Sequence, residues 1–544
     1  MKKIKACACL MAALGLASTF GFTSCVKKSD DENTLEISVN IGGYGSDSFK
    51  AIAKEFEKTH SGVSVVVNDV YLRLDQLEAN LKNPRSTTTD LYVTGNGTLL
   101  KGYVAKGKSF TASYDGVILE DISSVYQAKV EGEDVTVGEK MYDEFRDFYT
   151  WDMNNDGVTE NYIMPWHANV MSFIYNERVV NAALKGKSLP RTTNEFLALA
   201  KEIKANGVNP FVLTLDSAAH YWQAPVETWW AQYSGISNYN NFFRGINNNA
   251  YSKDIYTDWG RFVGLTEMER LIYAPNGLID PDSPSLEFSQ AQNKIFNGSA
   301  AFMANGDWFE NEMKDSDSKS NEARMMRTPV TSALSEKLSY YSDDRQTFYQ
   351  LSAEKQQEYD TLLSSIVAYV DGETDKESLD ARIKENDISI VSEARKIART
   401  NASTNAMFIP AFAKGKELAK EFLAFMAKDS NLELFMDNTT GSHLVFDYDF
   451  NKTEERKARY DKLSEFRKSV YDIENNVSLI RFVNEPIEYK GGLMAYCDLS
   501  TQLETYMISS NSGDRKTGKD IYDHCIAYMD DSRWDNILRL AGIK

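Results

Sequence analysis

Oxygen-bearing side chains recur at alternate positions in the segment WDMNNDGVTENYIMPWH, residues 151–167. The potential ligands are Asp152, Asn154, Asp156, the carbonyl of Val158 and Glu160. Hard oxygen ligands at this spacing suit Ca²⁺, so the segment predicts a structural calcium site. Position 12 of an EF-hand loop would be Ile163 and not a bidentate Glu, so this is no true EF-hand. A hairpin turn is the alternative, because Asn, Asp and Gly also favour turns.

A second group of polar and aromatic side chains follows segments that should form β-strands. It comprises Tyr44, Asn96, Trp166, His167 and Asn169. Open α/β sheets bind ligands at the carboxyl ends of their strands, so these residues should lie near one pocket. Amides and an imidazole suit the hydroxyl rim of a sugar, and an aromatic ring suits its C–H face. A mostly apolar pocket with a few placed polar groups is typical of small-molecule sites. For Tyr44 an exposed turn is the alternative.

Motifs for catalysis are lacking in the sequence. There is no HExxH, no GxSxG and no phosphate-binding GxxxxGK[ST], and no cysteine pair has zinc spacing. We therefore predict a binding protein that requires no cofactor. The alternatives are an exported glycan-processing enzyme, whose paired carboxylates can come from distant positions, and a ligand sensor or adhesive surface lipoprotein.

The composition restricts the class of partner. The chain has 544 residues, a formal net charge of −19 and a hydrophobic fraction of 42%. Nucleic-acid binding needs clustered basic residues, so the acidic balance excludes a general nucleic-acid binder. The length predicts more than one domain.

The N-terminus predicts export. Residues 1–24 have a basic start, an apolar run and small residues at the end, as a signal peptide does. The FTSC sequence ending at Cys25 resembles a bacterial lipobox, which implies cleavage before Cys25 and lipidation of its thiol. Residues 25–34 would then be a lipidated tether, and the protein would lie in the cell envelope, facing the periplasm or the exterior. The lipid would be its sole membrane contact; simple secretion is the alternative.

Two cysteines remain outside this N-terminal region, Cys497 and Cys525. Both fall in segments that read as helices. In an antiparallel hairpin Cys497 would lie roughly 9 Å further from the loop than Cys525, at 1.5 Å of rise per residue. That favours two unpaired buried thiols, although an export compartment permits a disulfide.

Strands and helices alternate along the first half of the chain. LEISVNI (35–41), a helix with Phe49, Ile52, Ala53 and Phe56 on one face, and GVSVVVND form a βαβ unit with parallel strands. A helix should begin near Thr192 or Thr193 and end at Gly207. Residues 333–400 are acidic and predicted to be helical without strands, and the last ~100 residues should be mostly helical by the same periodicity.

Six segments, in order, resemble the sugar-binding bacterial extracellular solute-binding proteins, the group that includes maltose-binding protein. They are FKAIAKEFEKTHSGVSVVV, TDLYVTGN with GVILEDIS, MPWHANVMSFIYN, LPRTTNEFLALAKEIKANGVNPFVL, FNGSAAFMANGDWFENEM and MFIPAFAKGKELAKEFLAFMAKD. The fifth is the most specific. The resemblance covers about residues 35–445, and Thr193 stands where the family has Trp.

The resemblance implies an α/β fold with two lobes, a hinge and the ligand between them. The expected division is an N-terminal lobe (35–163), a C-terminal lobe (164–330), a helical insertion (331–404), a return to the first lobe (405–440) and a helical segment completing the second (441–544). The insertion and the C-terminal extension depart from the family pattern.

The resemblance also implies a role and further site residues. Tyr221, Trp222 and Trp308 match segments that carry stacking aromatics, and either Trp229 or Trp230 should reach the ligand; we take Trp230. Trp308 could instead be core, and Asp307 could cap the next helix. Asn169 stands where the family often has a carboxylate, which indicates a neutral ligand. The implied protein is a monomeric receptor that delivers a carbohydrate to the permease subunits of an ABC transporter.

Overall fold

The computed structural model describes residues 33–94, 117–152, 157–214, 219–314, 322–343, 345–400, 406–439, 443–474, 477–480, 486–499 and 503–544. The predicted signal peptide (1–24), Cys25, Asn96, Asn154 and Asp156 lie outside these residues. Within them, no helix has both the length and the apolar character needed to cross a bilayer.

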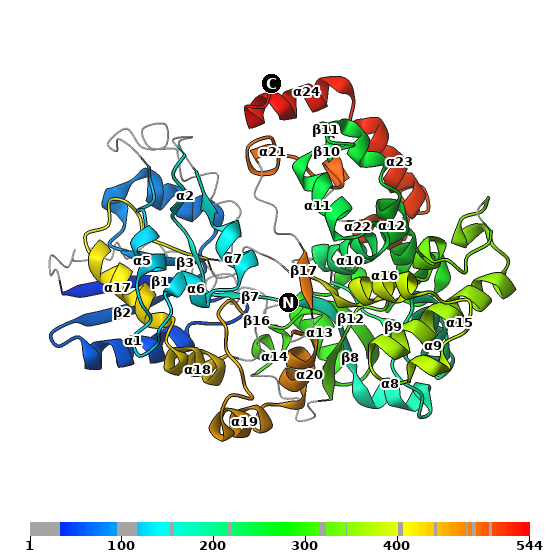
Figure 1. Cartoon of the computed structure of the whole chain (residues 1–544), viewed down its shortest axis with the longest axis horizontal. Helices are drawn as coiled ribbons and strands as arrows, with labels where there is room; N and C mark the ends of the chain where they lie inside the picture. Colours follow the sequence, from blue (N-terminus) through cyan, green and yellow to red (C-terminus); the bar gives the residue numbers. More distant parts are fainter. Residues whose placement is uncertain are drawn as a thin grey trace, which may run out of the picture.

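Two α/β bodies lie side by side, the N-lobe on the left of Figure 1 and the C-lobe on the right. The N-lobe is built on a five-stranded sheet in the order β2-β1-β3-β15-β6. These strands are β1 (Thr34–Asn40), β2 (Ser64–Val70), β3 (Leu91–Thr94), β6 (Met164–Pro165) and β15 (Ala406–Phe408). β1 pairs in parallel with β2, as predicted for the βαβ unit, and also with β3, whereas β15 is antiparallel to its neighbours β3 and β6.

Amphipathic helices cover the N-lobe sheet. The predicted first helix is α1 (Asp47–Thr59), which buries Phe49, Ile52, Ala53 and Phe56 as its periodicity indicates. The other N-lobe helices are α2 (Leu74–Lys82), α5 (Ser123–Gln127), α6 (Val137–Lys140), α7 (Asp143–Phe148), α17 (Lys416–Met426) and α18 (Asp429–Asn438). Two short ribbons complete the lobe: β4 (Thr150–Trp151) with β5 (Glu160–Asn161), and β7 (His167–Ala168) with β16 (His443–Leu444).

The C-lobe sheet has the order β17-β14-β8-β12-β9, and β13 also pairs with β8. Its strands are β8 (Met171–Asn176), β9 (Asn209–Phe211), β12 (Ala300–Gly306), β13 (Ala323–Met326), β14 (Ile397–Arg399) and β17 (Ser478–Ile480). β9 and β12 are parallel, and β8 runs antiparallel to β12. All residues of β8 and β12 are buried, which fits their continuous apolar runs.

Helices surround this second sheet. They are α8 (Glu177–Leu184), α9 (Thr193–Ala205), α10 (Gln223–Ser234), α11 (Ile236–Arg244), α12 (Trp259–Ile272), α13 (Phe288–Phe296) and α14 (Phe309–Glu312). The predicted start of α9 is confirmed, because the Thr192 side chain caps it by accepting from the Glu195 N–H. α12 packs tightly on α10 at Gly264, where a Cβ would lie 2.4 Å from the carbonyl oxygen of Val226.

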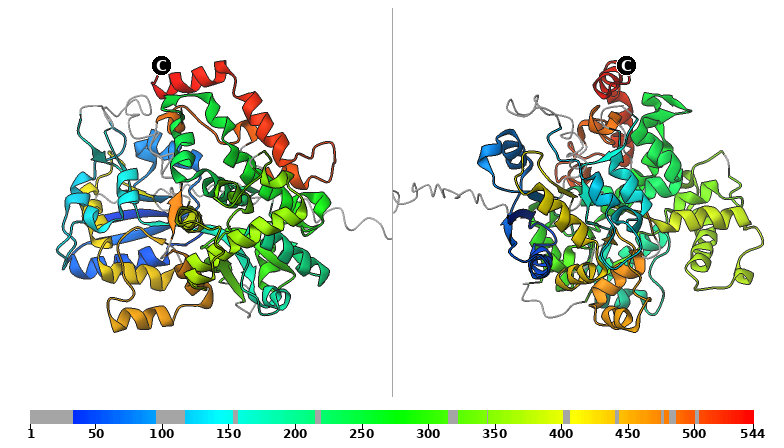
Figure 2. Two further views of the ribbon diagram at one scale, coloured as in Figure 1. Left: turned by 45° about the vertical axis from the view of Figure 1, so that its right-hand side comes forward. Right: turned by 60° about the vertical axis from the view of Figure 1, so that its left-hand side comes forward.

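The predicted helical insertion lies on the outer side of the C-lobe, away from the N-lobe (Figures 1 and 2). It contains α15 (Ala353–Val370) and α16 (Glu385–Lys396). The expectation that residues 333–400 lack strands is wrong at Ile397–Arg399, which form β14 of the C-lobe sheet. The short Ile-Ala-Arg segment directly after α16 gives no periodic strand signal, and its β structure comes from pairing with β8 and β17.

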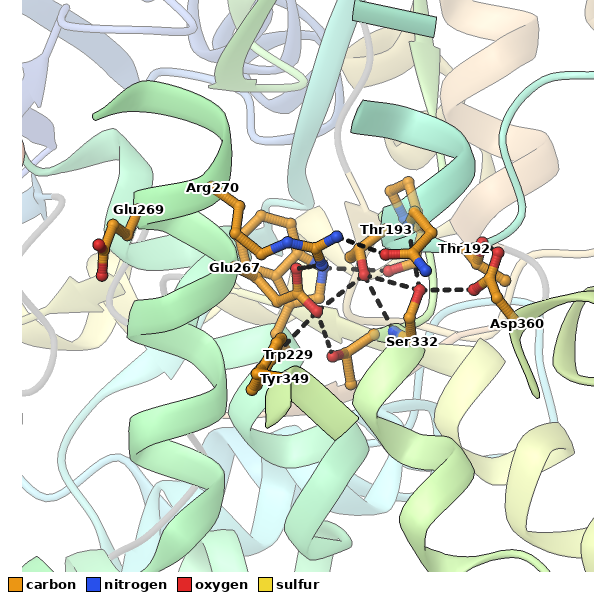
Figure 3. Close-up of polar contacts among 12 residues, drawn as sticks. Thr192, Thr193, Trp229, Glu267, Glu269, Arg270, Ser332, Tyr349 and Asp360 are labelled. Atoms are coloured by element: carbon orange, nitrogen blue, oxygen red, sulfur yellow. Dashed lines mark hydrogen bonds and ion pairs between the residues drawn. The ribbon is translucent and has the colours of Figure 1, made fainter. Parts of the chain in front are cut away.

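A buried polar network joins this insertion to the lobe (Figure 3). Asp360 of α15 accepts hydrogen bonds from the Thr192 hydroxyl at 2.9 Å and the Ser332 hydroxyl at 2.6 Å. Glu267 of α12 accepts from Thr193 at 2.8 Å and from Tyr349 at 2.9 Å. Both carboxyl groups are 1% exposed, so the hydroxyls replace water as their partners.

The C-terminal region is mainly helical, as predicted. Its helices are α19 (Glu454–Asp461), α20 (Glu465–Glu474), α21 (Pro486–Tyr489), α22 (Leu503–Ile508), α23 (Gly518–Tyr528) and α24 (Asp531–Ala541). The assignment of all of 441–544 to the second lobe is wrong for its first part. Leu444, Val445, Phe446, Tyr448 and Phe450 pack in the N-lobe core, because the apolar side chains of LVFDYDF need a hydrophobic partner close to β7. α21 to α24 then lie over α11 and α12 (Figure 1).

Candidate functional site at the boundary of the two lobes

One edge of the C-lobe sheet meets the N-lobe. The carboxyl ends of β9, β12 and β14 and the amino end of β8 lie along this edge, as the registers Gly306↔Met171 and Arg399↔Met171 show. Asp307 and Trp308 follow β12, and Tyr44 comes after β1 of the other lobe. The chain passes from β6 of the N-lobe to β8 of the C-lobe through His167 and Asn169. This is the edge at which α/β sheets bind ligands.

Direct hydrogen bonds join the lobes here. The Tyr44 hydroxyl donates to Asp307 Oδ1 at 2.5 Å, and the Asn311 amide donates to the Gly43 carbonyl at 2.5 Å. Asp307 Oδ2 also accepts from the Val170 N–H at 3.2 Å. Asp307 is fully buried, so its carboxylate depends on these donors. It does not cap the next helix, because the N-cap of α14 is Trp308.

An aromatic cluster surrounds this contact. The Tyr44 ring lies edge-on to His167 with centroids 4.2 Å apart and to Trp308 at 6.5 Å. Tyr221 lies 5.9 Å from Trp308. The Gly-Asp-Trp spacing has a steric reason, since a Cβ on Gly306 would lie 2.2 Å from the Trp308 ring. The structure thus brings together four of the predicted residues, Tyr44, His167, Tyr221 and Trp308.

Further polar groups line the same edge. The Thr400 hydroxyl lies 3.3 Å from Asn169 Oδ1, and both residues are buried. Arg399 at the end of β14 lies 3.3 Å from Glu227 of α10. Sequence patterns did not identify Arg399, Glu227, Thr400 or Asn311 as site residues. Glu227 and Asn311 stand on helices, whereas Arg399 ends the short strand β14 and Thr400 follows it. Two signals were available: the polar pair Arg399-Thr400 after two apolar residues, and the position of Asn311 in the FNGSAAFMANGDWFENEM segment.

Burial sets the charge state of two groups at this boundary. It lowers the pKa of His167 to about 3, so the imidazole is neutral at physiological pH. Burial also raises the pKa of Glu312 to about 7, against the opposing effect of a hydrogen bond from Gln292. The cluster around Tyr44 therefore offers neutral rings and hydroxyls beside one buried carboxylate, Asp307.

Three predicted aromatic residues lie elsewhere. Trp166 packs against Phe435 and Phe446 in the N-lobe core, and Trp230 packs against Tyr239 and Phe242 in the C-lobe. Both are completely buried. Trp222 is 2% exposed, stacks edge-on to Phe173 and Phe211, and lines a small cavity with Tyr221. Trp166, Trp222 and Trp230 therefore lie outside the cluster around Tyr44, and their contacts with a ligand stay predictions.

The loop predicted to bind calcium lies in the N-lobe, outside this boundary. Of its five potential ligands, Asp152, Val158 and Glu160 fall within the described residues. Asp152 Oδ2 accepts a hydrogen bond from the Gly157 N–H at 2.8 Å, and β4 pairs with β5 on either side. The described ends of the loop therefore lie close together, and they carry the carboxylates of Asp152 and Glu160. The donor set fits a hard cation and equally fits a plain turn, and among the described residues no acidic or His/Cys cluster forms a metal site.

The bond between Tyr44 and Asp307 should stabilise the contact between the lobes measurably. A hydrogen bond to a buried carboxylate contributes ~1.5–3 kcal/mol. We expect a double-mutant cycle of Tyr44→Phe and Asp307→Asn, followed by urea unfolding, to give a coupling energy in that range. A coupling near zero, with each single change adding independently, would show that the bond does not form in solution.

The sequence of this chain matches the model of one known protein family. The model of the family described as bacterial extracellular solute-binding protein matches residues 42–433. No curated protein matches the chain.

Several solved structures have the same fold. A family 1 extracellular solute-binding protein from Bifidobacterium longum subsp. infantis is 16% identical, with a TM-score of 0.51; the alignment covers 92% of this chain and 98% of that one. The maltose-bound MalE3 of T. maritima is 13% identical, with a TM-score of 0.56 and coverage of 91% and 98%. A chitin oligosaccharide binding protein is 14% identical, with a TM-score of 0.56 and coverage of 92% and 98%. With the family model matching well over half of its length, this chain belongs to the bacterial extracellular solute-binding proteins.

Proposed function

We propose that the protein is a lipid-anchored receptor that binds a sugar or oligosaccharide between its lobes for import by an ABC transporter. The observation that carries this proposal is the aromatic and hydroxyl cluster of Tyr44, His167, Tyr221 and Trp308, which draws on both lobes at the ligand-binding edge of a sheet. Two structural neighbours support it, because one is maltose-bound and the other is a chitin oligosaccharide binding protein.

The chemistry of the cluster favours a neutral carbohydrate. The rings of Trp308 and Tyr221 can cover the C–H face of a pyranose, and Asp307, Asn169 and Thr400 can hydrogen-bond hydroxyl groups. Because His167 stays neutral and Arg399 lies beside Glu227, no uncompensated cation is present among these residues to select an anionic ligand. A ligand that contacts both lobes would favour their closure.

A thermal-shift screen against a library of neutral mono- and oligosaccharides tests the proposal. A ligand that binds the native state alone stabilises it by about 2.7 kcal/mol at 100 times its Kd, so a binder must raise the melting temperature. Isothermal titration of each hit then gives its affinity. If no glycan shifts the melting temperature but amino acids or peptides do, the ligand is not a carbohydrate and belongs to one of those classes. Release of reducing ends from a bound glycan would show that the protein is a glycan-processing enzyme.

The lipid anchor is proposed at Cys25. A Cys25→Ala change should move the protein from the membrane pellet to the soluble fraction, because acyl chains hold the membrane by burying methylenes. Immunoblots of the two fractions check this. If the variant stays in the pellet, the anchor lies elsewhere.

Calcium is proposed as a structural ion of the 152–160 loop. Chelation by EDTA should lower the melting temperature of the wild type, and added Ca²⁺ should restore it. Asp156→Ala should remove the difference between the two conditions. Mg²⁺ at the same concentration is the control, since it prefers octahedral water-rich sites. An unchanged melting temperature in EDTA would favour the plain turn.

A further inference from the structure

Cys497 and Cys525 meet inside the C-terminal helical region. The Cys497 thiol lies 3.6 Å from the carbonyl oxygen of Cys525, although the residues are 28 positions apart. Both are buried and unpaired in this structure. The sequence suggested that Cys497 lies in a long helix. It lies instead in a short 3-10 turn, Cys497–Leu499, which packs against α23. The offset of roughly 9 Å that a regular helical hairpin would place between the two cysteines therefore does not apply.

A buried cation lies beside this pair. Arg261 of α12 is fully buried, and its Nη1 donates to the Tyr256 carbonyl at 2.6 Å and its Nη2 to the Ala495 carbonyl. Its guanidinium also lies 4.9 Å from the Tyr256 ring centroid. A hydrogen bond from Cys497 and the nearby Arg261 lower the pKa of the Cys525 thiol.

Cys497 also has a route to solvent. It lines a depression of about 490 Å³ formed with residues of the 491–494 turn and of α24, among them Met494, Ser532 and Asn536. Cys497 is only 1% exposed, so it lies at the floor of that depression. A small thiol reagent or disulfide can enter there, whereas Cys525 lies behind it and is fully buried.

We propose that Cys497 and Cys525 form a disulfide in the exported protein, which ties the turn before α22 to α23. The Cys497 thiol contacts the backbone of Cys525, so the two residues are near enough for side-chain rotation to bring their sulfurs together, and the extracellular location of the family supplies an oxidising compartment. The proposal is independent of the ligand that the lobes bind.

The exchange balances with a disulfide-containing oxidant such as oxidised glutathione. Cys497 attacks one sulfur of the oxidant, forms a mixed disulfide and releases one thiol, which takes the Cys497 proton. Cys525 then attacks the Cys497 sulfur as a thiolate and forms the protein disulfide, and the leaving sulfur takes the Cys525 proton and departs as the second thiol. Two protein thiols are oxidised and one small disulfide is reduced to two thiols.

Peptide mapping tests the pairing directly. Protein from the cell envelope is quenched in acid, alkylated without reductant and digested with trypsin. We expect one linked species joining peptides 491–515 and 520–533, which disappears on reduction. These peptides exclude Cys25, so lipidation does not interfere. Recovery of both peptides as alkylated free thiols, even after the folded protein is equilibrated with oxidised glutathione, would overturn the proposal.

Thermal unfolding provides the second readout. Reductant should lower the melting temperature of the wild type by several degrees, because the cross-link restrains the unfolded chain. The Cys525→Ser and Cys497→Ser variants should melt at the same temperature with and without reductant. If reductant leaves the wild type unchanged, or lowers the variants equally, no disulfide stabilises this region.

Discussion

Replacing Trp308 by alanine is expected to weaken carbohydrate binding by ~1–3 kcal/mol, as aromatic truncations do at binding hot spots. Trp308 belongs to a small cluster with Tyr44, Met171 and Ala224 at the lobe boundary. Its ring is 9% exposed and contacts residues of both lobes. The free energy of unfolding should therefore fall by less than the ~3–5 kcal/mol of a core Trp→Ala change. Titration calorimetry and a urea melt on the same variant measure the two quantities.

Two further variants sharpen this test. Trp308→Phe keeps an apolar ring and should retain part of the affinity. Trp259→Ala removes a partly buried indole at the start of α12, away from the lobe boundary, and should leave affinity unchanged. Full affinity in Trp308→Ala together with a large loss of stability would place Trp308 in the core and remove the main aromatic contact from the proposed site.

Replacing Asp360 by asparagine should change how stability depends on pH. Burial raises the pKa of Asp360 from 3.8 to about 7 in the folded protein. Between these values the unfolded chain releases the proton that the folded protein keeps, so stability falls as pH rises. From pH 5 to pH 8 this group should reduce the free energy of unfolding by roughly 2–3 kcal/mol, and Asp360→Asn should lack that part of the decline.

Urea unfolding of both proteins at pH 5, 6.5 and 8 measures the difference. Burial also raises the pKa of Glu504 to about 8 and of Glu312 to about 7, and these groups remain in the variant, so some decline should persist. Glu358→Gln, on a partly exposed position of the same helix, is the matched control and should follow the wild type. Parallel pH profiles for the wild type and Asp360→Asn would mean that Asp360 ionises in the folded protein as it does in the unfolded chain.

Local patterns in the sequence predicted the elements that depend on local physics. The apolar face of α1 follows from residues three and four apart, and the start of α9 follows from a threonine with a glutamate three residues later. The family resemblance, carried by segments such as GDW, supplied the two-lobed fold and pointed to Trp308.

Contacts between residues far apart in the sequence could not be predicted from local patterns. Tyr44 and Asp307 are 263 positions apart, and neither residue type indicates the other. The strand at Ile397–Arg399 depends on β8 and β17, and the apolar residues at 444–450 could have joined either lobe. Trp166 and Trp230 show the limit of residue type as a guide, because an indole after a strand or within a helix serves a core as well as a ligand.

The position of β15 within the N-lobe sheet has a consequence for how the chain folds after export. β15 lies between β3 and β6, yet about 310 residues separate it from the end of β3. A chain that emerges N-terminus first at ~5–20 residues per second would expose the unpaired edge of β3 for roughly 15–60 s. An open strand edge invites pairing with other chains. The N-lobe therefore folds late despite its early place in the sequence, and a periplasmic holding chaperone should raise the yield of folded protein more than it would for a protein whose sheets form from consecutive strands.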